Sequence, residues 1–207
     1  MDIHISIVSH KNNNDVSRLL LQLSKNITPK RVTITENTRD KPIIIPNSLK
    51  DFTQIIYNTK PKGFGENHNS ALLSTKCKYI AIINPDVSIE NISFNKLINS
   101  ISKEVKFVTP RATCRDSKLI NNFRPFPSVF SPIRNLFVKD NNTYNEEEIV
   151  ADWISGMFIV TESKVFRQLD GFDEGYFLYY EYVDLCRRWM SYNFKCKVIN
   201  TEKVIHE

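Results

Sequence analysis

The chain has 207 residues, enough for one α/β domain with a sizeable core or at most two small ones. Its net charge is +5, but the Lys and Arg residues are scattered, so we expect an anionic small molecule rather than a nucleic acid as partner. No signal-peptide pattern opens the chain, and no apolar run is long enough to cross a bilayer. The four cysteines form no CxxC pair, so we expect reduced thiols in a cytoplasmic protein with at most peripheral membrane contact.

Strand and helix patterns alternate along the first half of the chain. Alternating or continuous apolar runs predict strands over 3–9, 31–35, 52–57, 79–83 and 105–109. Helical spacing of apolar residues predicts helices over 15–25, 66–74 and about 94–101. This alternation indicates an α/β fold with a mostly parallel central sheet flanked by helices. In such sheets ligands bind beyond the carboxyl ends of the strands, so polar residues there are candidate site residues.

The pattern is less regular in the second half. Residues 111–148 are rich in Pro, Asn and charge, which is typical of a functional lid or of disorder. A strand with a bend at Gly156 is predicted over 149–160, followed by a helix over 163–168 with Ser163 as its N-cap. The second half of the segment 177–192 is predicted to be helical, and a last strand is predicted over 195–200.

Asn84-Pro85-Asp86 follows the most hydrophobic strand in the chain. A carboxylate at this place can hold a divalent cation that bridges two phosphates, because Mg²⁺ favours a few carboxylates together with phosphate oxygens and water. All three residues are also common in turns, so an ordinary turn is the alternative.

Two further clusters lie near strand ends in the first half. Glu36-Asn37 ends the second predicted strand, where an acid can accept a hydrogen bond from a uracil or thymine imide or from a ribose hydroxyl. Gly63-Phe64-Gly65 precedes a helix, and we expect the start of that helix and Asn69 to contact a nucleotide. A solvated Glu and a plain glycine turn are the alternatives.

The second half carries aromatic and acidic residues in close succession. Trp153 lies beside Ser155-Gly156, where it serves either as a core residue or as a platform for a sugar ring. Asp173 and Glu174 form either a solvated turn or part of a sugar site. Glu181 and Asp184 share one helix face, where Arg187 and Arg188 offer them structural ion pairs as the alternative to a catalytic role. His206 is either a surface residue or a metal ligand.

In their shared order, these motifs resemble the family 2 glycosyltransferases, and most of all the rhamnosyltransferase-like enzymes of bacterial surface-polysaccharide synthesis. The resemblance covers nearly the whole chain. The motifs that carry it are Glu36-Asn37, Gly63-Phe64-Gly65 with Asn69, Asn84-Pro85-Asp86-Val87, Trp153-Ile154-Ser155-Gly156, Gly171-Phe172-Asp173-Glu174, Tyr180-Glu181-Tyr182-Val183-Asp184-Leu185-Cys186 and His206.

The resemblance implies a single GT-A domain over 1–207, a nucleotide-diphospho-sugar donor, a Mg²⁺ or Mn²⁺ ion and inversion at the anomeric carbon. Residues 1–110 would bind the nucleotide-sugar, 111–148 would form the acceptor-side segment, and 149–207 would form the acceptor and catalytic half. The implied nucleotide ligands are Ser9, His10, Glu36, Asn37, Gly63, Gly65, Asn69 and Asn84. The implied metal ligands are Asp86 and His206, and the implied sugar and acceptor residues are Trp153, Gly156, Asp173 and Glu174.

The chain departs from the family pattern at one important position. Tyr182 stands where the family has its catalytic Asp, and a phenol with an ordinary pKa of about 10 is a poor base at neutral pH. We expect Glu181 to replace it, with Asp184 as a second choice and a catalytically inactive sugar-nucleotide-binding homologue as the remaining alternative. Family members also continue past the His, so we expect either a minimal enzyme or a chain shortened after Glu207.

The implied donors are dTDP-rhamnose and UDP-galactose or UDP-glucose, and the implied acceptor is a saccharide or a lipid-linked oligosaccharide. A nucleic-acid methyltransferase is a third interpretation, because Asn-Pro-Asp after a strand is similar to an Asn-Pro-Pro-aromatic motif. That interpretation is weak, because Val87 stands where the aromatic residue would have to stack on a flipped base.

Overall fold

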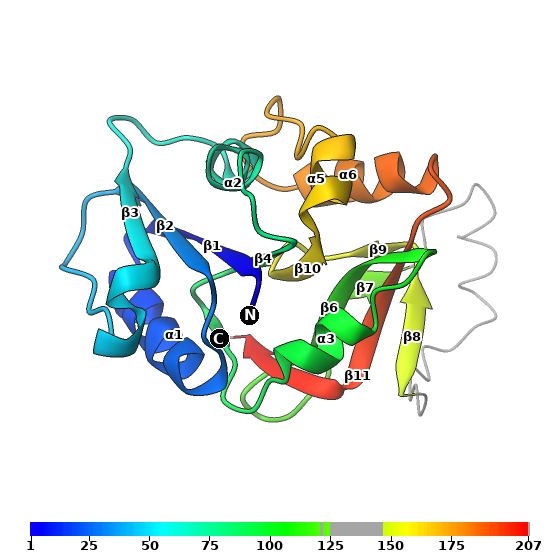
Figure 1. Cartoon of the computed structure of the whole chain (residues 1–207), viewed down its shortest axis with the longest axis horizontal. Coiled ribbons are helices and arrows are strands. Elements are labelled where there is room, and N and C mark those ends of the chain that lie inside the picture. Colours follow the sequence, from blue (N-terminus) through cyan, green and yellow to red (C-terminus); the bar gives the residue numbers. More distant parts are fainter. Residues whose placement is uncertain (121, 125–146, 207) are drawn as a thin grey trace.

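The computed structural model describes residues 1–120, 122–124 and 147–206, so most of the irregular segment predicted over 111–148 lies outside the described residues. One nine-stranded sheet runs through the described part, in the order β3-β2-β1-β4-β10-β6-β11-β5, with β8 paired to β11 (Figure 1). The strands on the amino-terminal side are β1 (Ile3–His10), β2 (Arg31–Thr38), β3 (Thr53–Tyr57) and β4 (Tyr79–Ile83). The others are β5 (Val87–Ser88), β6 (Val105–Thr113), β8 (Glu148–Ala151), β10 (Phe158–Glu162) and β11 (Lys195–His206).

The sheet is mixed rather than mostly parallel, which corrects this detail of the predicted fold. Strands β3, β2, β1 and β4 are parallel, and so are β6 and β11. Strand β10 lies antiparallel between β4 and β6. Strand β10 begins at Phe158, which pairs with Ile83 at the carboxyl end of β4. From there β10 runs toward the amino-terminal end of β4, so the two strands are antiparallel.

Helices cover both faces of the sheet (Figure 1). Helices α1 (Asn13–Asn26) and α3 (Phe94–Asn99) lie on one face, and α2 (Phe64–Leu72), α5 (Ser163–Gln168) and α6 (Glu181–Met190) lie on the other. A short 3₁₀ helix, η1 (Asn47–Phe52), precedes β3. None of the described helices is long and apolar enough to span a membrane.

Two apolar cores follow from the alternation of side chains along the strands. Ile3, Ile5 and Ile7 of β1 belong to the core under α1 and α3. The core under α2, α5 and α6 is built on Ile80 and Ile82 of β4. Ala81 and Ile83 of β4 belong to the first core, so this central strand contributes side chains to both layers.

A buried polar layer separates β1 from α2. The His4 ring is hydrogen-bonded to Thr75 Oγ1 at 2.9 Å and to Thr33 Oγ1 at 2.7 Å, and Ser6 Oγ lies 2.8 Å from His68 Nδ1. Burial lowers the pKa of His4 to about 4, helped by the nearby Arg31, and burial lowers that of His68 to about 3. Both imidazoles are thus neutral at pH 7.

The second half differs from its predicted elements in three ways. The strand predicted over 149–160 is divided into β8, β9 (Trp153–Ile154) and β10, and β9 pairs with β7 (Phe123–Arg124). The predicted N-cap role of Ser163 is wrong, because Glu162 is the N-cap and the Ser163 hydroxyl donates to the Cys77 carbonyl at 2.6 Å. Strand β11 continues to His206, well past its predicted end at 200.

Candidate functional site

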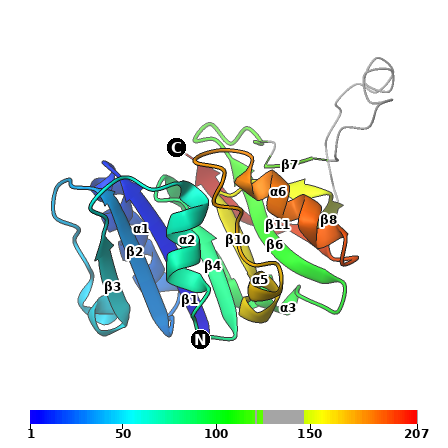
Figure 2. The same ribbon diagram turned by 90° about the horizontal axis from the view of Figure 1, so that it is seen from above.

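The carboxyl ends of β1, β2, β4 and β11 meet at one edge of the sheet, because the ladder makes these four strands run in the same direction. Figure 2 shows the amino terminus at the opposite edge from the end of β11. The predicted clusters at the strand ends therefore share one edge: Ser9-His10, Glu36-Asn37, Asn84 to Asp86, and His206.

Asp86 and His206 form the candidate metal centre. Strand β5 pairs with the end of β11, with His206 opposite Val87, and this places Asp86 Oδ2 3.5 Å from His206 Nε2. The other carboxylate oxygen, Asp86 Oδ1, is buried and has no hydrogen-bond partner among the described residues. A buried carboxylate oxygen without a donor fits a cation ligand, since burial of an uncompensated polar atom is costly.

The donor set also fits the expected type of ion. The described residues hold no group of three or more His, Cys, Asp or Glu side chains that could bind a metal. Two protein ligands leave most of the coordination sphere to phosphate oxygens and water, as Mg²⁺ prefers. Asn84 shapes the turn before Asp86, with its amide donating to the Met157 carbonyl at 2.8 Å and its carbonyl accepting from Val87 at 3.2 Å.

Glu36 is fixed by a polar network at the ends of β1 and β2. Its Oε1 accepts hydrogen bonds from Asn13 Nδ2 and from the Asp40 amide, each at 3.0 Å. The Ser9 hydroxyl in turn donates to Asn13 Oδ1 and to Asn12 Oδ1, the latter at 2.9 Å. Asn13 links Ser9 to Glu36 and was missed by sequence reasoning, although a buried Asn in the first turn of α1 is an unusual residue for that position.

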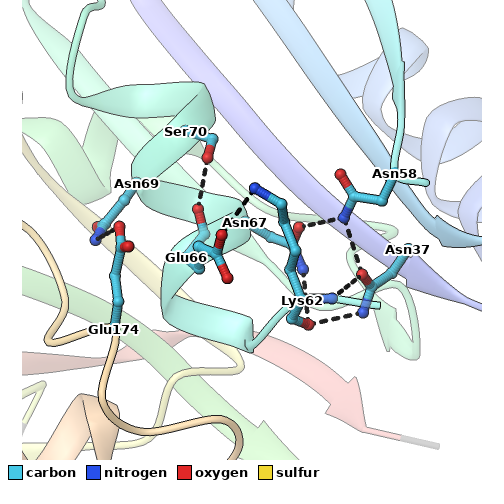
Figure 3. Close-up of polar contacts among 8 residues, drawn as sticks. All are labelled: Asn37, Asn58, Lys62, Glu66, Asn67, Asn69, Ser70 and Glu174. Carbon is cyan, nitrogen blue, oxygen red and sulfur yellow. Dashed lines mark hydrogen bonds and ion pairs between the residues drawn. The ribbon is translucent and has the colours of Figure 1, made fainter. Parts of the chain in front are cut away.

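Asn37 is hydrogen-bonded to the segment that leads into α2 (Figure 3). Its Oδ1 accepts from the Lys62 amide at 2.8 Å and from Asn58 Nδ2 at 2.9 Å, and its Nδ2 donates to the Lys62 carbonyl at 2.9 Å. Asn58 Nδ2 also donates to Asn67 Oδ1 at 2.7 Å. His10 Nδ1 lies 3.4 Å from the Asn37 amide nitrogen, so these two predicted nucleotide ligands are neighbours.

The structure does not bring Asn69 together with the predicted nucleotide ligands at the ends of β1 and β2. Asn69 and Glu174 lie on one side of α2, whereas Asn37, Asn58 and Lys62 lie on the other (Figure 3). Asn69 Nδ2 donates to the Phe172 carbonyl at 2.8 Å and to Glu174 Oε1 at 3.0 Å, and Asn69 Oδ1 accepts from the Phe172 amide at 2.9 Å. Its amide group is thus engaged with the loop between α5 and α6.

Gly63 and Gly65 allow that same loop to approach α2 closely. A Cβ at Gly63 would lie 2.9 Å from the Phe177 carbonyl oxygen, and a Cβ at Gly65 would lie 2.7 Å from Phe172 Cβ. The Phe64 amide donates to the Phe177 carbonyl at 2.9 Å. Both positions therefore require glycine because a larger residue would collide with the loop.

Trp153, Gly156 and Tyr182 belong to one aromatic cluster. The rings of Trp153 and Tyr182 are 5.9 Å apart, and a Cβ at Gly156 would lie 3.3 Å from Tyr182 and 3.4 Å from the Phe64 ring. Burial, followed by the nearby Glu181, raises the pKa of Tyr182, so its phenol stays neutral at pH 7.

Glu181 and Asp184 have different environments although both lie in the first turn of α6. Glu181 is only 2% exposed, and its Oε2 has no hydrogen-bond partner within the described part of the chain. Burial raises the pKa of this carboxyl above its ordinary value. Asp184 instead forms an ion pair with Arg188 Nε at 2.7 Å, which is the structural alternative predicted for this pair of acids.

Asp173 and Glu174 lie in the loop after α5. Asp173 accepts from the Gly175 amide at 2.8 Å, which forms a tight turn. The two carboxylates line an open cavity of about 410 Å³ together with Asn69, Leu73, Leu169, Asp170, Phe172 and Arg188. Because Asp86 and His206 do not line this cavity, it is distinct from the candidate metal centre.

Solved structures establish the class of fold. The chain matches GalNAc-T7 with UDP, GalNAc and Mn²⁺ at a TM-score of 0.69 and 13% identity, over 99% of this chain and 42% of that one. It matches Staphylococcus aureus TarS 1–349 at a TM-score of 0.61 and 13% identity, over 99% and 59% of the two chains. It matches the Pyrobaculum calidifontis mannosyltransferase PcManGT in complex with GDP-Man and Mn²⁺ at 0.59 and 11% identity, over 99% and 56%.

These matches confirm the predicted GT-A glycosyltransferase fold, although the chain spans only about two fifths to three fifths of the lengths of those proteins. No family model matches the chain. In sequence it is similar to the rhamnosyltransferase WbbL of Escherichia coli K12, with 27% identity over 202 residues, 90% of this chain and 76% of WbbL. The predicted resemblance to rhamnosyltransferase-like members of glycosyltransferase family 2 is thereby confirmed.

Proposed function

We propose that the chain is a metal-dependent, inverting glycosyltransferase of bacterial cell-surface polysaccharide synthesis, such as that of O-antigen or capsule. It moves rhamnose, galactose or glucose from a dTDP- or UDP-sugar to a saccharide or lipid-linked acceptor, in the cytoplasm or at the inner face of the membrane. The observation that carries this proposal is the pairing of Asp86 with His206 at the carboxyl edge of the sheet. The similarity to a rhamnosyltransferase, and the Mn²⁺ and nucleotides named with two structural neighbours, support it.

Different residues at the sheet edge would bind different parts of the donor. Glu36, which accepts from Asn13 and from the Asp40 amide, would accept a hydrogen bond from a base imide or a ribose hydroxyl. Asp86 and His206 would hold Mg²⁺ or Mn²⁺, which when bound neutralises the charge of the leaving diphosphate. Trp153 and Tyr182 offer aromatic faces to a sugar ring.

Glu181 is the base that we propose for the reaction. It takes the proton of the acceptor hydroxyl while that oxygen bonds to the anomeric carbon and the nucleotide diphosphate leaves from the opposite face. A carboxylate whose pKa is raised by burial is a stronger base than an ordinary one. Asp184 is less suited to this role because its carboxylate is already paired with Arg188.

A catalytically inactive homologue that only binds a sugar nucleotide is the second candidate. The observation that favours it is Tyr182, whose phenol stands at the position of the family's catalytic Asp and whose pKa is raised further by burial. Donor binding would be common to both candidates, so only transfer distinguishes them.

The deciding experiment is a thermal-shift screen with UDP, dTDP, GDP and their sugars, each with Mn²⁺ and with EDTA. We expect one diphosphate to raise the Tm only with the metal, because a ligand that binds the folded state alone stabilises it. Asp86→Asn should abolish that shift, whereas Glu90→Gln, an exposed acid four residues away, should keep it. A shift that persists in EDTA and in Asp86→Asn would refute the metal site. Donor-to-acceptor transfer of labelled sugar then separates the active enzyme from the inactive homologue.

A further inference from the structure

The loop over 169–180 connects α5 to α6 and ends next to Glu181. It also carries five consecutive exposed large hydrophobic residues, Tyr176 to Tyr180, and the last two have left-handed backbone conformations with φ of 65° and 66°. Bulky residues rarely adopt this conformation, so the surrounding contacts must hold the loop in its shape. Two side chains hold the first part of the loop, residues 169–174, and the Phe64 amide holds the later part by donating to the Phe177 carbonyl at 2.9 Å.

Asn69 is the first of them. Its side-chain amide makes three hydrogen bonds to this loop, two to the Phe172 backbone and one to Glu174, at 2.8 to 3.0 Å. Gly171 completes the contact, because it has a φ of +65° and a Cβ there would lie 2.2 Å from Asn69 Oδ1. Asn69 and Gly171 therefore form a matched pair, and the side chain is 103 residues away from Phe172 along the chain.

Arg188 is the second. Its guanidinium donates to the carbonyls of Leu169 and Gly171, the latter at 2.8 Å, while its Nε holds Asp184. A planar guanidinium can make such a forked contact with two carbonyls, and a Lys ammonium cannot reproduce its geometry. Arg188 thus ties the start of the loop to the same helix that carries Glu181.

We infer that Asn69 and Arg188 are positioning residues that set the loop over 169–180, and through it Glu181, for the acceptor. The inference rests on the proposed function and assigns Asn69 a role away from the nucleotide. It predicts that loss of either side chain weakens use of the acceptor while leaving binding of the donor nucleotide intact. In the described part of the chain, the hydrogen bonds and ion pair of Glu36 and Asp86 go to other residues.

The test compares Asn69→Ala and Arg188→Lys with two controls on the same helices, Ser70→Ala and Arg187→Lys, whose side chains are exposed. Steady-state transfer should show an acceptor KM at least tenfold higher in both test variants and a donor KM within twofold of wild type. The controls should behave as wild type. A donor KM that rises while the acceptor KM stays constant would overturn the inference and return Asn69 to the nucleotide site.

Hydrogen exchange by mass spectrometry decides the inference without any activity. Exchange over 169–180 should become at least tenfold faster in both test variants and stay unchanged over α1. Unchanged exchange in that loop would refute the inference. If Asn69→Ala does not fold, Glu174→Ala replaces it, because this variant removes one of the hydrogen bonds between Asn69 and the loop. We expect a smaller increase in exchange over 169–180 in Glu174→Ala. A wild-type protein without transfer would count against the proposed function alone.

Discussion

At the scale of single residues, burial distinguishes two acids that the sequence presents as equivalent. Glu181 and Asp184 lie one turn apart on α6, but among the described residues only Asp184 forms an ion pair, with Arg188. Glu181 is buried next to the aromatic Tyr182, and its raised pKa reflects that burial. A carboxyl group that is costly to ionise, with one oxygen that has no hydrogen-bond partner among the described residues, is the better candidate for accepting a proton.

We predict that Glu181→Gln lowers the transfer rate by a factor of about 10² to 10⁴, the usual contribution of a general base. Because the base must be deprotonated, the rate should rise with pH through a pKa above that of an ordinary Glu, and this acid limb should vanish in the variant. The measurements are kcat against pH and nucleotide-dependent Tm, and the latter should not change. Asp184→Asn is the companion variant. If Asp184→Asn lost transfer activity and Glu181→Gln kept it, Asp184 rather than Glu181 would be the base.

At the scale of elements, α2 is the common support of the two halves of the site. Asn37 is hydrogen-bonded to Lys62 in the segment that leads into α2, and Asn69 of α2 is hydrogen-bonded to the 169–180 loop. Glycines at 63, 65 and 171 make these contacts possible, because any Cβ there would meet atoms of the opposing segment at under 3 Å. The helix therefore lies between the nucleotide side and the acceptor side of the proposed enzyme.

Gly171→Ala should lower the free energy of unfolding by at least about 1 kcal/mol, since a left-handed conformation costs an L-residue about 1–2 kcal/mol and the new methyl group also meets Asn69. The control is Gly175→Ala, an exposed glycine with no positive φ, where the added Cβ would lie 3.1 Å from the exposed Asp173 side chain. Because that side chain can move, we expect a change within about 0.5 kcal/mol. Urea denaturation of both variants measures the difference. Equal stability of the two would show that the contact between Gly171 and Asn69 contributes little.

At the scale of the whole molecule, two neutral histidines are enclosed between the sheet and α2. The folded-state pKa values of about 4 for His4 and about 3 for His68 lie below the ordinary value of 6.5. The unfolded chain therefore binds more protons than the folded one below pH 6.5. The contribution of these two neutral histidines to the free energy of unfolding is fully present above pH 6.5. It is lost as the pH falls toward 4.

We predict that the free energy of unfolding falls between pH 6.5 and pH 4.5 with a slope approaching about 1.4 kcal/mol per pH unit for each histidine. Urea titrations at several pH values measure the slope, which should be smaller in His4→Gln and His68→Asn whatever their stability at pH 7. His10→Gln, at an exposed position, serves as the control and should keep the wild-type slope. An unchanged slope in both buried variants would contradict the prediction.

Local sequence patterns were sufficient for most of the elements. The periods of two and 3.6 residues located β1, α1, β4 and α6 to within a few residues, because these patterns are set by neighbours in the sequence. The direction of β10 and the division of the strand predicted over 149–160 could not be read in this way. They depend on which strands pair, and pairing is decided by packing over long distances.

The sequence by itself determined the order of elements, the polar residues at the strand ends and the resemblance to family 2 glycosyltransferases, since residue types and local spacing carry all three. Only the tertiary structure decided what those residues meet. It placed His206 beside Asp86 through the pairing of β5 with β11, and it turned Asn69 and Arg188 toward one loop. Hydrogen bonds between residues about a hundred positions apart depend on strand register and helix packing, which no local pattern specifies.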